Sequence, residues 1–368
     1  MNYLIPFIIL ITVVVFIHEY GHYYIAKKYG VGVTDFSIGF GKEIFGWNDK
    51  SGTRWKICWI PLGGYVKFFG DRNVFSQSEQ AEVLKKYNKE DQKKLFILKP
   101  LYQRSLIVAA GPIANFVLAV LIFIFIYMFV GKDMTPAIVN EVQKDSPAYI
   151  SGMKKNDRIV SIDNKKVNSI LEVSTFISTS TPESIEFIIL RNSQKLIFYI
   201  KPDLVESEDS LGNKIKKRMI GIKLAPFNNE FNNVKLGPTK AIFYSVKEVW
   251  FVSTTSLKYI GSMITGSGDS SQLGGPIRIA KITGQVAKYG IIPFLSVMAY
   301  ISISLGLINL FPIPMLDGGH LMFYFFEKIL GRPLGQKTQE GFFRIGIFLL
   351  FSLMFFATFN DLKDLGLF

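Results

Sequence analysis

The chain has 368 residues, of which 49% are hydrophobic and 14% aromatic, and its formal net charge is +13 at pH 7. The length would accommodate two or three soluble domains, but the apolar residues gather in a few stretches, which argues against a purely soluble protein. The positive charge does not indicate nucleic-acid binding, because aromatic residues do not alternate with basic ones as in a base-stacking groove. The single cysteine, Cys58, excludes an internal disulfide and a multi-cysteine metal site.

Four stretches are almost free of charged residues: Tyr3–Ile17, Leu106–Val130, Gly290–Phe311 and Phe342–Phe359. A helix needs about 20 residues to cross the hydrocarbon core of a bilayer. The second and third stretches reach this length, the first does so if its helix continues through Ile25, and the fourth does so with a slight tilt. No basic residue precedes the first stretch and no small-x-small cleavage site follows it, so we interpret it as a membrane helix and not as a signal peptide. The expected fold is a polytopic α-helical membrane protein with about four transmembrane helices.

The segment Thr34–Gly70 follows the first helix and alternates short apolar or aromatic runs with basic residues and glycines. This pattern predicts strands, and strands beside a membrane need paired backbone groups, so we expect them at an interface or inside the protein. Residues 1–131 should therefore form an N-terminal membrane part with two helices and a β segment. Between Lys27 and Arg104 there are 15 Lys or Arg against 8 Asp or Glu. This excess is typical of the cytoplasmic side of a membrane protein.

Residues 132–233 are polar and rich in β-like runs, which predicts one small inserted α+β domain. Two runs, Ile185–Leu190 and Leu196–Ile200, flank Asn192 and Ser193, which predicts a hairpin turn. The rest of the chain, 234–368, should begin with an amphipathic helix near Lys235–Thr265 that lies on a membrane surface. The remaining two apolar stretches follow it.

The sequence His18-Glu-Tyr-Gly-His22 lies at the end of the first apolar stretch. Residues four apart share one face of a helix, so both imidazoles can converge on a single Zn²⁺. Glu19 can then reach a water at the metal, take its proton, and pass that proton to the leaving amine. Ionisable side chains at such depth are costly to bury without a partner, so we interpret the motif as a metal site and not as ordinary surface residues.

A catalytic zinc usually has three protein ligands, and two histidines leave it one short. Only one other apolar segment offers a candidate, namely Asn309–His320, where Pro312 and Pro314 interrupt the helix. Irregular backbone at membrane depth is tolerated where it lines a cavity. Either Asp317 or His320 could supply the third ligand, and the residues alone leave both open.

Taken together, these motifs resemble the site-2 protease family of intramembrane metalloproteases, particularly the bacterial regulator-of-sigma-E-protease type. The likeness covers the His18–His22 motif, the glycine-rich β segment, Gly111–Asn115, a PDZ-like domain and Leu316–Gly318, in this order. The resemblance implies that His18, His22 and Asp317 bind zinc, that Glu19 is the catalytic base, and that His320 has a structural role near the site.

Two asparagines are candidates for substrate binding. The resemblance matches Asn309 to an asparagine implicated in substrate handling, although a second family asparagine falls on Ser304 here. A hydrogen bond between helices is the alternative for Asn309. Asn115 follows an expected helix break at Gly111-Pro112 and could line the cavity, or it could satisfy backbone groups at that break.

The inserted domain resembles a PDZ domain in the segment Ser146–Asp163, with Asn156 where the pattern usually has glycine. Asparagine also tolerates a left-handed backbone. PDZ domains capture peptides or C-termini by strand addition, so a peptide partner is expected. The alternative is a domain that only excludes bulky substrates.

The resulting hypothesis is a zinc endopeptidase of the bacterial inner membrane that cleaves transmembrane segments of membrane proteins after a first cut. Such regulated intramembrane proteolysis would act on substrates such as anti-sigma factors or signal-peptide remnants. The basic segment places the zinc near the cytoplasmic face and the PDZ-like domain in the periplasm. The principal alternative is a non-proteolytic zinc-binding scaffold that acts through its PDZ domain. A zinc transporter would need His-rich loops, and the sequence contains none.

Overall fold

The computed structural model describes residues 3–70, 87–178, 180, 183–208, 214–226, 232–266, 270 and 273–365. The chain forms two compact units, each described by itself below. The first unit consists mainly of Met1–Ile122 and Gly274–Lys363, and the second of Phe123–Leu273.

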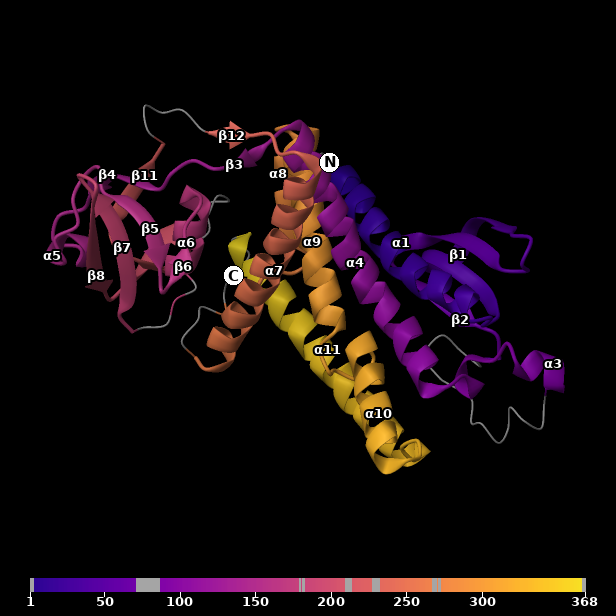
Figure 1. The fold of residues 1–368 in the computed structure, drawn as a ribbon. Coiled ribbons are helices and arrows are strands. Elements are labelled where there is room, and N and C mark those ends of the chain that lie inside the picture. The colour runs from indigo at the N-terminus through magenta and orange to yellow at the C-terminus, as the bar shows by residue number, and fades with distance from the viewer. Residues whose placement is uncertain are drawn as a thin grey trace. The chain divides into compact units, whose positions relative to one another are not determined.

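Four helices are long and apolar enough to cross a membrane, as the four apolar stretches predict. They are α1 (Leu4–Lys28), α4 (Leu101–Phe129), α9 (Ile291–Asn309) and α11 (Gln336–Asp364) (Figure 1). The first residues of α4 belong to the first unit and its last residues to the second. Helices of this length and composition indicate a membrane protein.

Small residues bring three of these helices close together. A Cβ on Gly21 of α1 would overlap the carbonyl oxygen of Ala110 in α4, and a Cβ on Gly306 of α9 would lie 3.0 Å from the carbonyl oxygen of Pro112. Glycine at such contacts lets helix backbones approach without a side chain between them. The expected break at Gly111-Pro112 was wrong, because α4 continues through Pro112. Helices in membrane proteins accommodate an internal proline where neighbouring groups satisfy the freed carbonyl.

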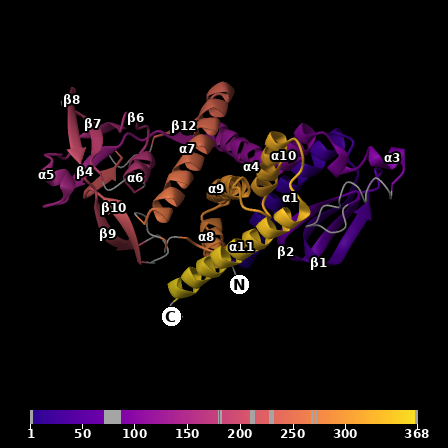
Figure 2. The same cartoon turned by 90° about the horizontal axis from the view of Figure 1, so that it is seen from below.

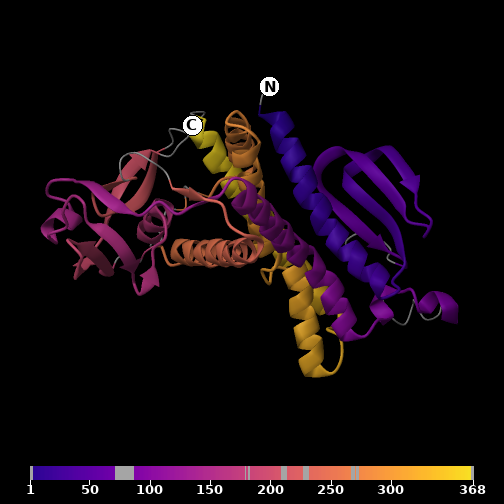
Figure 3. The same cartoon turned by 45° about the horizontal axis from the view of Figure 1, so that its top comes forward.

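The predicted β segment is an antiparallel hairpin of β1 (Val33–Asn48) and β2 (Arg54–Phe68), which runs alongside α1 (Figure 3). Phe36 is fully buried and stacks on Trp55 with ring centroids 4.2 Å apart. Tyr23 of α1 donates a hydrogen bond of 2.9 Å to Asp49 at the hairpin turn. The hairpin is therefore fixed to the helix that carries the His18–His22 motif. A short helix α3 (Lys89–Gln92) and a 3-10 turn η1 (Phe96–Leu98) precede α4.

The C-terminal part of the first unit holds two further helices, α8 (Pro276–Ala287) and α10 (Asp317–Leu330). The sequence did not predict α8, which packs against α1 and α9 (Figure 2). The carboxylate of Asp361 in α11 accepts hydrogen bonds from three backbone N–H groups at the start of α8, those of Gly275 (2.8 Å), Ile277 (3.0 Å) and Arg278 (3.1 Å). A carboxylate from a distant helix thus caps α8 and satisfies N–H groups that would otherwise lack partners.

The second unit contains a six-stranded sheet in the order β11-β4-β5-β7-β8, with β6 paired to β5 (Figure 1). Its elements are β4 (Ile138–Val142), β5 (Arg158–Ile162), β6 (Lys165–Lys166), β7 (Ile185–Arg191), β8 (Gln194–Ile200) and β11 (Ile222–Ala225), with helices α5 (Pro147–Ile150) and α6 (Ile170–Ser178). The core includes Val139, Val173, Phe187 and Ile189, all fully buried.

The predicted hairpin turn is confirmed, because Asn192 and Ser193 join β7 to β8 with φ angles of 47° and 67°. Asn156 adopts a φ of 70°, the left-handed conformation that its position requires. The second unit also contains two pairs of strands, β3 (Lys132–Asp133) with β12 (Asn233–Val234) and β9 (Asp203–Glu208) with β10 (Lys214–Met219). The long helix α7 (Pro238–Ile264) follows, where an amphipathic helix was predicted.

Candidate metal centre

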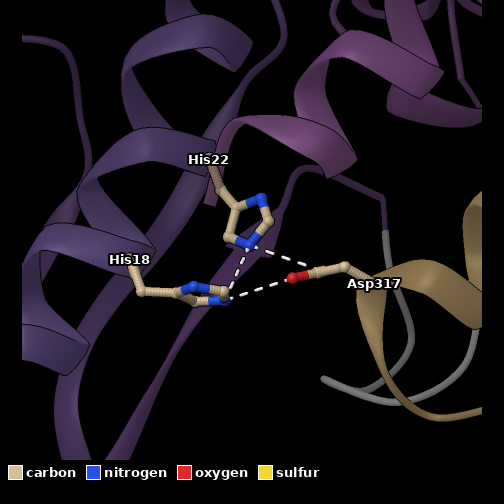
Figure 4. Close-up of side chains that lie close together, drawn as sticks. All are labelled: His18, His22 and Asp317. Atoms are coloured by element: carbon tan, nitrogen blue, oxygen red, sulfur yellow. Dashed lines mark hydrogen bonds and ion pairs between the residues drawn. The ribbon is translucent and has the colours of Figure 1, made fainter. Parts of the chain in front are cut away.

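The two histidines of α1 point their Nε2 atoms toward each other, 3.3 Å apart (Figure 4). The Nδ1–H of His22 donates a hydrogen bond of 2.9 Å to the carbonyl oxygen of Ile107 in α4. Because a carbonyl can only accept, this bond places the proton of His22 on Nδ1 and leaves a lone pair on Nε2. The ring is thus prepared to bind a cation through Nε2.

The side chain of Asn115 in α4 contacts His18, with its Nδ2 atom 3.1 Å from Nδ1 of the imidazole. Asn115 is fully buried, and its Oδ1 has no hydrogen-bond partner among the described residues. The atom that faces Nδ1 is Nδ2 of Asn115, and a turn of the amide by 180° exchanges it with Oδ1. When His18 binds a cation through Nε2, its proton is on Nδ1, and Oδ1 of the turned amide accepts that proton in a hydrogen bond. Asn115 therefore fixes the ring orientation of a predicted ligand.

Asp317 brings a carboxylate to the two imidazoles from α10. Its Oδ2 lies 3.2 Å from Nε2 of His18, and its Oδ1 lies 3.5 Å from Nε2 of His22 (Figure 4). One ligand atom from each residue lies within 4.8 Å of the others. The buried Oδ2 is close to His18 but makes no hydrogen bond of acceptable geometry within the described structure. The three donor atoms are close enough to bind one cation together. Such a cation would also give the Oδ2 of Asp317 a partner.

Local backbone geometry explains why Asp317 reaches this place. Helix α9 ends at Asn309 and α10 begins at Asp317, so the predicted interruption around Pro312 and Pro314 is confirmed. Cβ atoms on Gly318 or Gly319 would overlap carbonyl oxygens of the connecting segment, so the first turn of α10 can pack here only with glycine. Farther along α10, Glu327 forms an ion pair with Arg104 of α4, with an N–O distance of 2.5 Å. This ion pair connects α10 to α4, whose Ile107 and Asn115 contact the two imidazoles.

The donor set fits zinc, for which two imidazole nitrogens and one carboxylate oxygen are usual ligands in a catalytic site. Gly111 of α4 supports this fit, because a Cβ there would overlap Nε2 of His22 and lie 2.9 Å from Cε1 of His18. Only glycine at this position leaves the space between the imidazoles and α4 free. The sequence motif Gly111-Pro112 carried this signal, but it was interpreted as a helix break.

Glu19 points into a cavity of about 420 Å³ that the two histidines and Asp317 also line. It is not one of the three clustered ligands. Strand β2 borders the same cavity with Gly64, where a Cβ would lie 3.0 Å from Cγ of Glu19. The absence of a side chain at Gly64 thus leaves space for the Glu19 side chain, which the sequence alone did not indicate. A carboxylate beside the ligands, but outside their cluster, can exchange protons with a bound water.

His320 lines the same cavity but stands apart from the three clustered donors. Its ring lies near Phe343 and Phe323, with centroid distances of 5.9 and 6.4 Å. Burial lowers the pKa of His320, which lies outside the four candidate spans, and so favours its neutral ring. Of the two candidates that the residues left open, the structure places Asp317 at the imidazoles.

The two asparagines occupy different places. Asn309 lines the cavity, and its Nδ2 lies 3.5 Å from Nε2 of His18. Asn115 does not belong to the cavity lining and contacts His18 instead. Ser304 is exposed and donates a hydrogen bond of 3.0 Å to the carbonyl oxygen of Tyr300 in its own helix. The position of the second family asparagine therefore faces away from the cavity.

Comparison with known proteins gives matches over nearly the whole chain. The family model described as Peptidase family M50 matches residues 6–353. A relative named "Putative zinc metalloprotease" from Agrobacterium fabrum is 41% identical over 364 residues, which cover 99% of this chain and 96% of the relative. "Metalloprotease MmpA" from Caulobacter vibrioides is 33% identical over 387 residues, which cover 99% of this chain and 96% of that relative. Among solved structures, the PDZ domain of an SdrC-like protein from Listeria monocytogenes covers 24% of this chain and 87% of its own, at 22% identity and a TM-score of 0.20.

Proposed function

Because the chain belongs to Peptidase family M50, the site-2 protease family, and is a metalloprotease, we propose that it is a zinc endopeptidase that cleaves transmembrane segments of other membrane proteins. The observation that carries this proposal is the convergence of His18, His22 and Asp317 beside Glu19 in one cavity. His18, Glu19 and His22 belong to α1, a helix long and apolar enough to span a bilayer. A site on such a helix is suited to substrates that are themselves in the membrane.

His18 and His22 would hold zinc through Nε2, and Asp317 would hold it through a carboxylate oxygen. When bound, zinc supplies a Lewis acid that makes water nucleophilic near neutral pH. Glu19 takes the proton of the attacking water and transfers it to the nitrogen of the scissile peptide bond as that bond breaks. Asn309, which lines the same cavity, is placed to hydrogen-bond a peptide group of the substrate.

The proposed location is the bacterial inner membrane, with the metal centre toward the cytoplasmic face and the inserted domain in the periplasm. The excess of basic residues between Lys27 and Arg104 supports this orientation, because such residues accumulate on the cytoplasmic side. Substrates would be single-span proteins that an earlier cut has shortened, as in regulated intramembrane proteolysis.

Replacement of Glu19 by Gln tests the proposed chemistry. We expect the variant to keep bound zinc but to lose at least about 100-fold of its cleavage rate, because a general base contributes roughly 10²–10⁴-fold. The measurement is cleavage of a model single-span substrate by purified full-length protein, together with its zinc content. Glu90→Gln, an exposed change on α3, is the matched control and should leave both unchanged.

Turnover by Glu19→Gln at the wild-type rate would contradict the role of Glu19. A wild-type chain that binds zinc but cleaves no membrane substrate would favour the alternative, a zinc-binding scaffold. A scaffold needs no carboxylate beside its metal ligands, and the place of Glu19 in the cavity therefore supports the protease.

We propose that the inserted domain, which we interpret as a PDZ domain, controls access to the metal centre. It contains no histidine and so adds none to the metal ligands. Strand β11 is one of the two end strands in the order of the described sheet and could pair with an extended peptide. The alternative is exclusion of bulky substrates without peptide binding.

Replacement of residues 132–233 by a short flexible linker distinguishes these roles. If the domain excludes bulky substrates, the deletion variant should still bind zinc and cleave a shortened substrate, and should also cleave one with an intact ectodomain. The measurement is cleavage of both substrates by both proteins. A deletion variant that folds and binds zinc but cleaves neither substrate would show that peptide capture is required.

A further inference from the structure

A second cavity lies within the second unit, between α7 and the elements β6 and α6 of the inserted domain. Its volume is about 340 Å³, within the roughly 300–1,000 Å³ of small-molecule sites. Five lysines line it: Lys132, Lys165, Lys166, Lys247 and Lys258. Phe176 of α6 and Phe251 of α7 meet edge to face at this cavity, with ring centroids 5.5 Å apart. We call this cavity the lysine cleft.

The positive charge of the lysine cleft is mostly uncompensated. Its two acidic residues, Glu172 and Glu248, have partners of their own. Glu248 pairs with Lys132 at 2.8 Å, and Glu172 accepts a 2.8 Å hydrogen bond from the backbone N–H of Asn168. For the other four lysines, no carboxylate of a described residue lies within ion-pair distance. The cleft therefore has five ammonium groups against two carboxylates, and only Lys132 forms an ion pair within the described residues.

Lys165 of β6 and Lys258 of α7 both line the cleft. Lys258 lowers the pKa of Lys165 below its ordinary value through direct side-chain contact, and burial acts in the same direction. The nearby carboxylate of Asp163 opposes this shift but does not reverse it. Two like charges held together repel each other unless an anion bridges them. Because both side chains line the same cavity, an anion bound in it would reduce this repulsion.

The exposed face of α7 beside the cleft is apolar. Phe243, Val246, Trp250 and Leu257 recur at spacings of three, four and seven residues, and Trp250 is 71% exposed. Lys247 and Lys258, eleven residues or about three turns apart, border this stripe on the side of the cleft. An apolar stripe flanked by lysines, with an exposed tryptophan, is typical of a helix that lies in a membrane interface.

We propose that the lysine cleft binds the phosphate-containing headgroup of an anionic phospholipid, with the apolar stripe of α7 in the adjacent acyl region. The phosphate would bridge Lys165 and Lys258, and Lys166 and Lys247 would neutralise the further negative charge of the headgroup. A free phosphate ion would use the same lysines but would leave the apolar stripe without a partner. The stripe and the cleft lie side by side on one helix, which favours a ligand that has both a charged and an apolar part.

The test measures binding to the purified full-length protein in detergent by native mass spectrometry. The probes are dihexanoyl phosphatidylglycerol, dihexanoyl phosphatidylcholine and inorganic phosphate. We expect wild-type protein to prefer the anionic lipid over phosphatidylcholine by about tenfold or more, because each lysine near anionic lipid contributes roughly 1 kcal/mol and tenfold corresponds to about 1.4 kcal/mol. The double variant Lys165→Gln/Lys258→Gln should lose most of this preference. Lys165→Arg/Lys258→Arg should retain it.

The matched control is Lys154→Gln/Lys195→Gln, which removes two exposed lysines of the inserted domain outside the cleft. It should bind as the wild type does. An equal loss in this control would mean that general positive charge, and not the cleft, attracts the lipid. Equal binding of both lipids by wild-type protein, or binding of inorganic phosphate as tight as that of phosphatidylglycerol, would also overturn the proposal. All readouts are independent of proteolysis, so the proposal can fail while the proposed function holds.

Discussion

The metal centre and the lysine cleft are built in opposite ways. At the metal centre, two imidazoles and a carboxylate face one another in a buried place, and the backbone of α4 comes so close that Gly111 has no room for a Cβ. At the cleft, four of the five lysines are long, exposed side chains that line one cavity. The first arrangement suits a cation and the second suits an anion.

This contrast also predicts how each region tolerates change. A site set by close backbone packing holds its donors in one geometry and is damaged by a single methyl group. A cleft of flexible lysines can lose one side chain without disturbing its neighbours, because each ammonium is a mobile point charge. Substitutions should therefore have large effects at the metal centre and small ones at the cleft.

The largest effect is expected for Asp317→Asn. The neutral amide removes the only negative charge among the three clustered donors, so zinc affinity should fall by more than about 100-fold. Loss of a residue that only hydrogen-bonds a metal ligand typically costs about 10–100-fold, and loss of a ligand should cost more. Cleavage should fall in parallel. The measurement is zinc content after dialysis against a weak chelator, together with the cleavage assay.

His320→Ala is the matched comparison for Asp317→Asn, since both residues lie on the first turns of α10 and line the same cavity. This variant should retain zinc. If His320→Ala lost zinc while Asp317→Asn kept it, the third ligand would be His320 and not Asp317.

A smaller effect is expected for Gly111→Ala. The new Cβ would overlap Nε2 of His22, so the ring must move or α4 must retreat. A displacement of about 1 Å at a catalytic group can reduce the rate on the order of 100-fold, and we expect a loss of this size in cleavage.

Gly261→Ala provides the control in the other region, because a Cβ at Gly261 of α7 would meet nothing within 4 Å. There the change should stabilise the helix by about 0.5–1 kcal/mol without loss of cleavage. Thermal midpoints and cleavage rates of both variants test the comparison. Equal tolerance of alanine at the two positions would contradict the close packing of α4 against the imidazoles.

The sequence allowed the metal centre to be predicted only in part. His18, Glu19 and His22 were identifiable because their spacing places them on adjacent faces of one helix, a purely local property. Asp317 is almost 300 residues away, so the residues alone could not separate it from His320. The outcome depends on how the first turn of α10 packs against the segment after α9, where Gly318 and Gly319 allow close backbone contact.

The fold was predictable to a similar extent. Long apolar stretches predicted the four candidate spans, and alternating residues predicted the β hairpin. Helix α8 was missed, because its start is stabilised by Asp361 from a distant helix and not by its own sequence. Pro112 was wrongly taken as a helix break, since packing against neighbours overrides its local preference. The lysine cleft has no local signature at all, because its lysines come from β3, β6 and α7.

The smallest effect is expected for Lys258→Gln in the lysine cleft. The substitution removes the repulsion that lowers the pKa of Lys165, so at neutral pH the variant should unfold at a slightly higher temperature than wild type. The two free energies of unfolding should differ by no more than about 0.5 kcal/mol, as is usual for a surface substitution. The repulsion is present below the lowered pKa of Lys165 and disappears as the pH rises through it toward the ordinary value of about 10.4. The thermal midpoints of the two proteins should therefore become equal in alkaline solution.

With dihexanoyl phosphatidylglycerol at neutral pH, wild type should have the higher thermal midpoint, because the lipid stabilises only the protein that binds it. Thermal unfolding in detergent at several pH values, with and without this lipid, measures all three differences, and Lys195→Gln should follow wild type throughout. If the lipid raised the midpoint of Lys258→Gln as much as that of wild type, the repelling pair would not be where the anion binds.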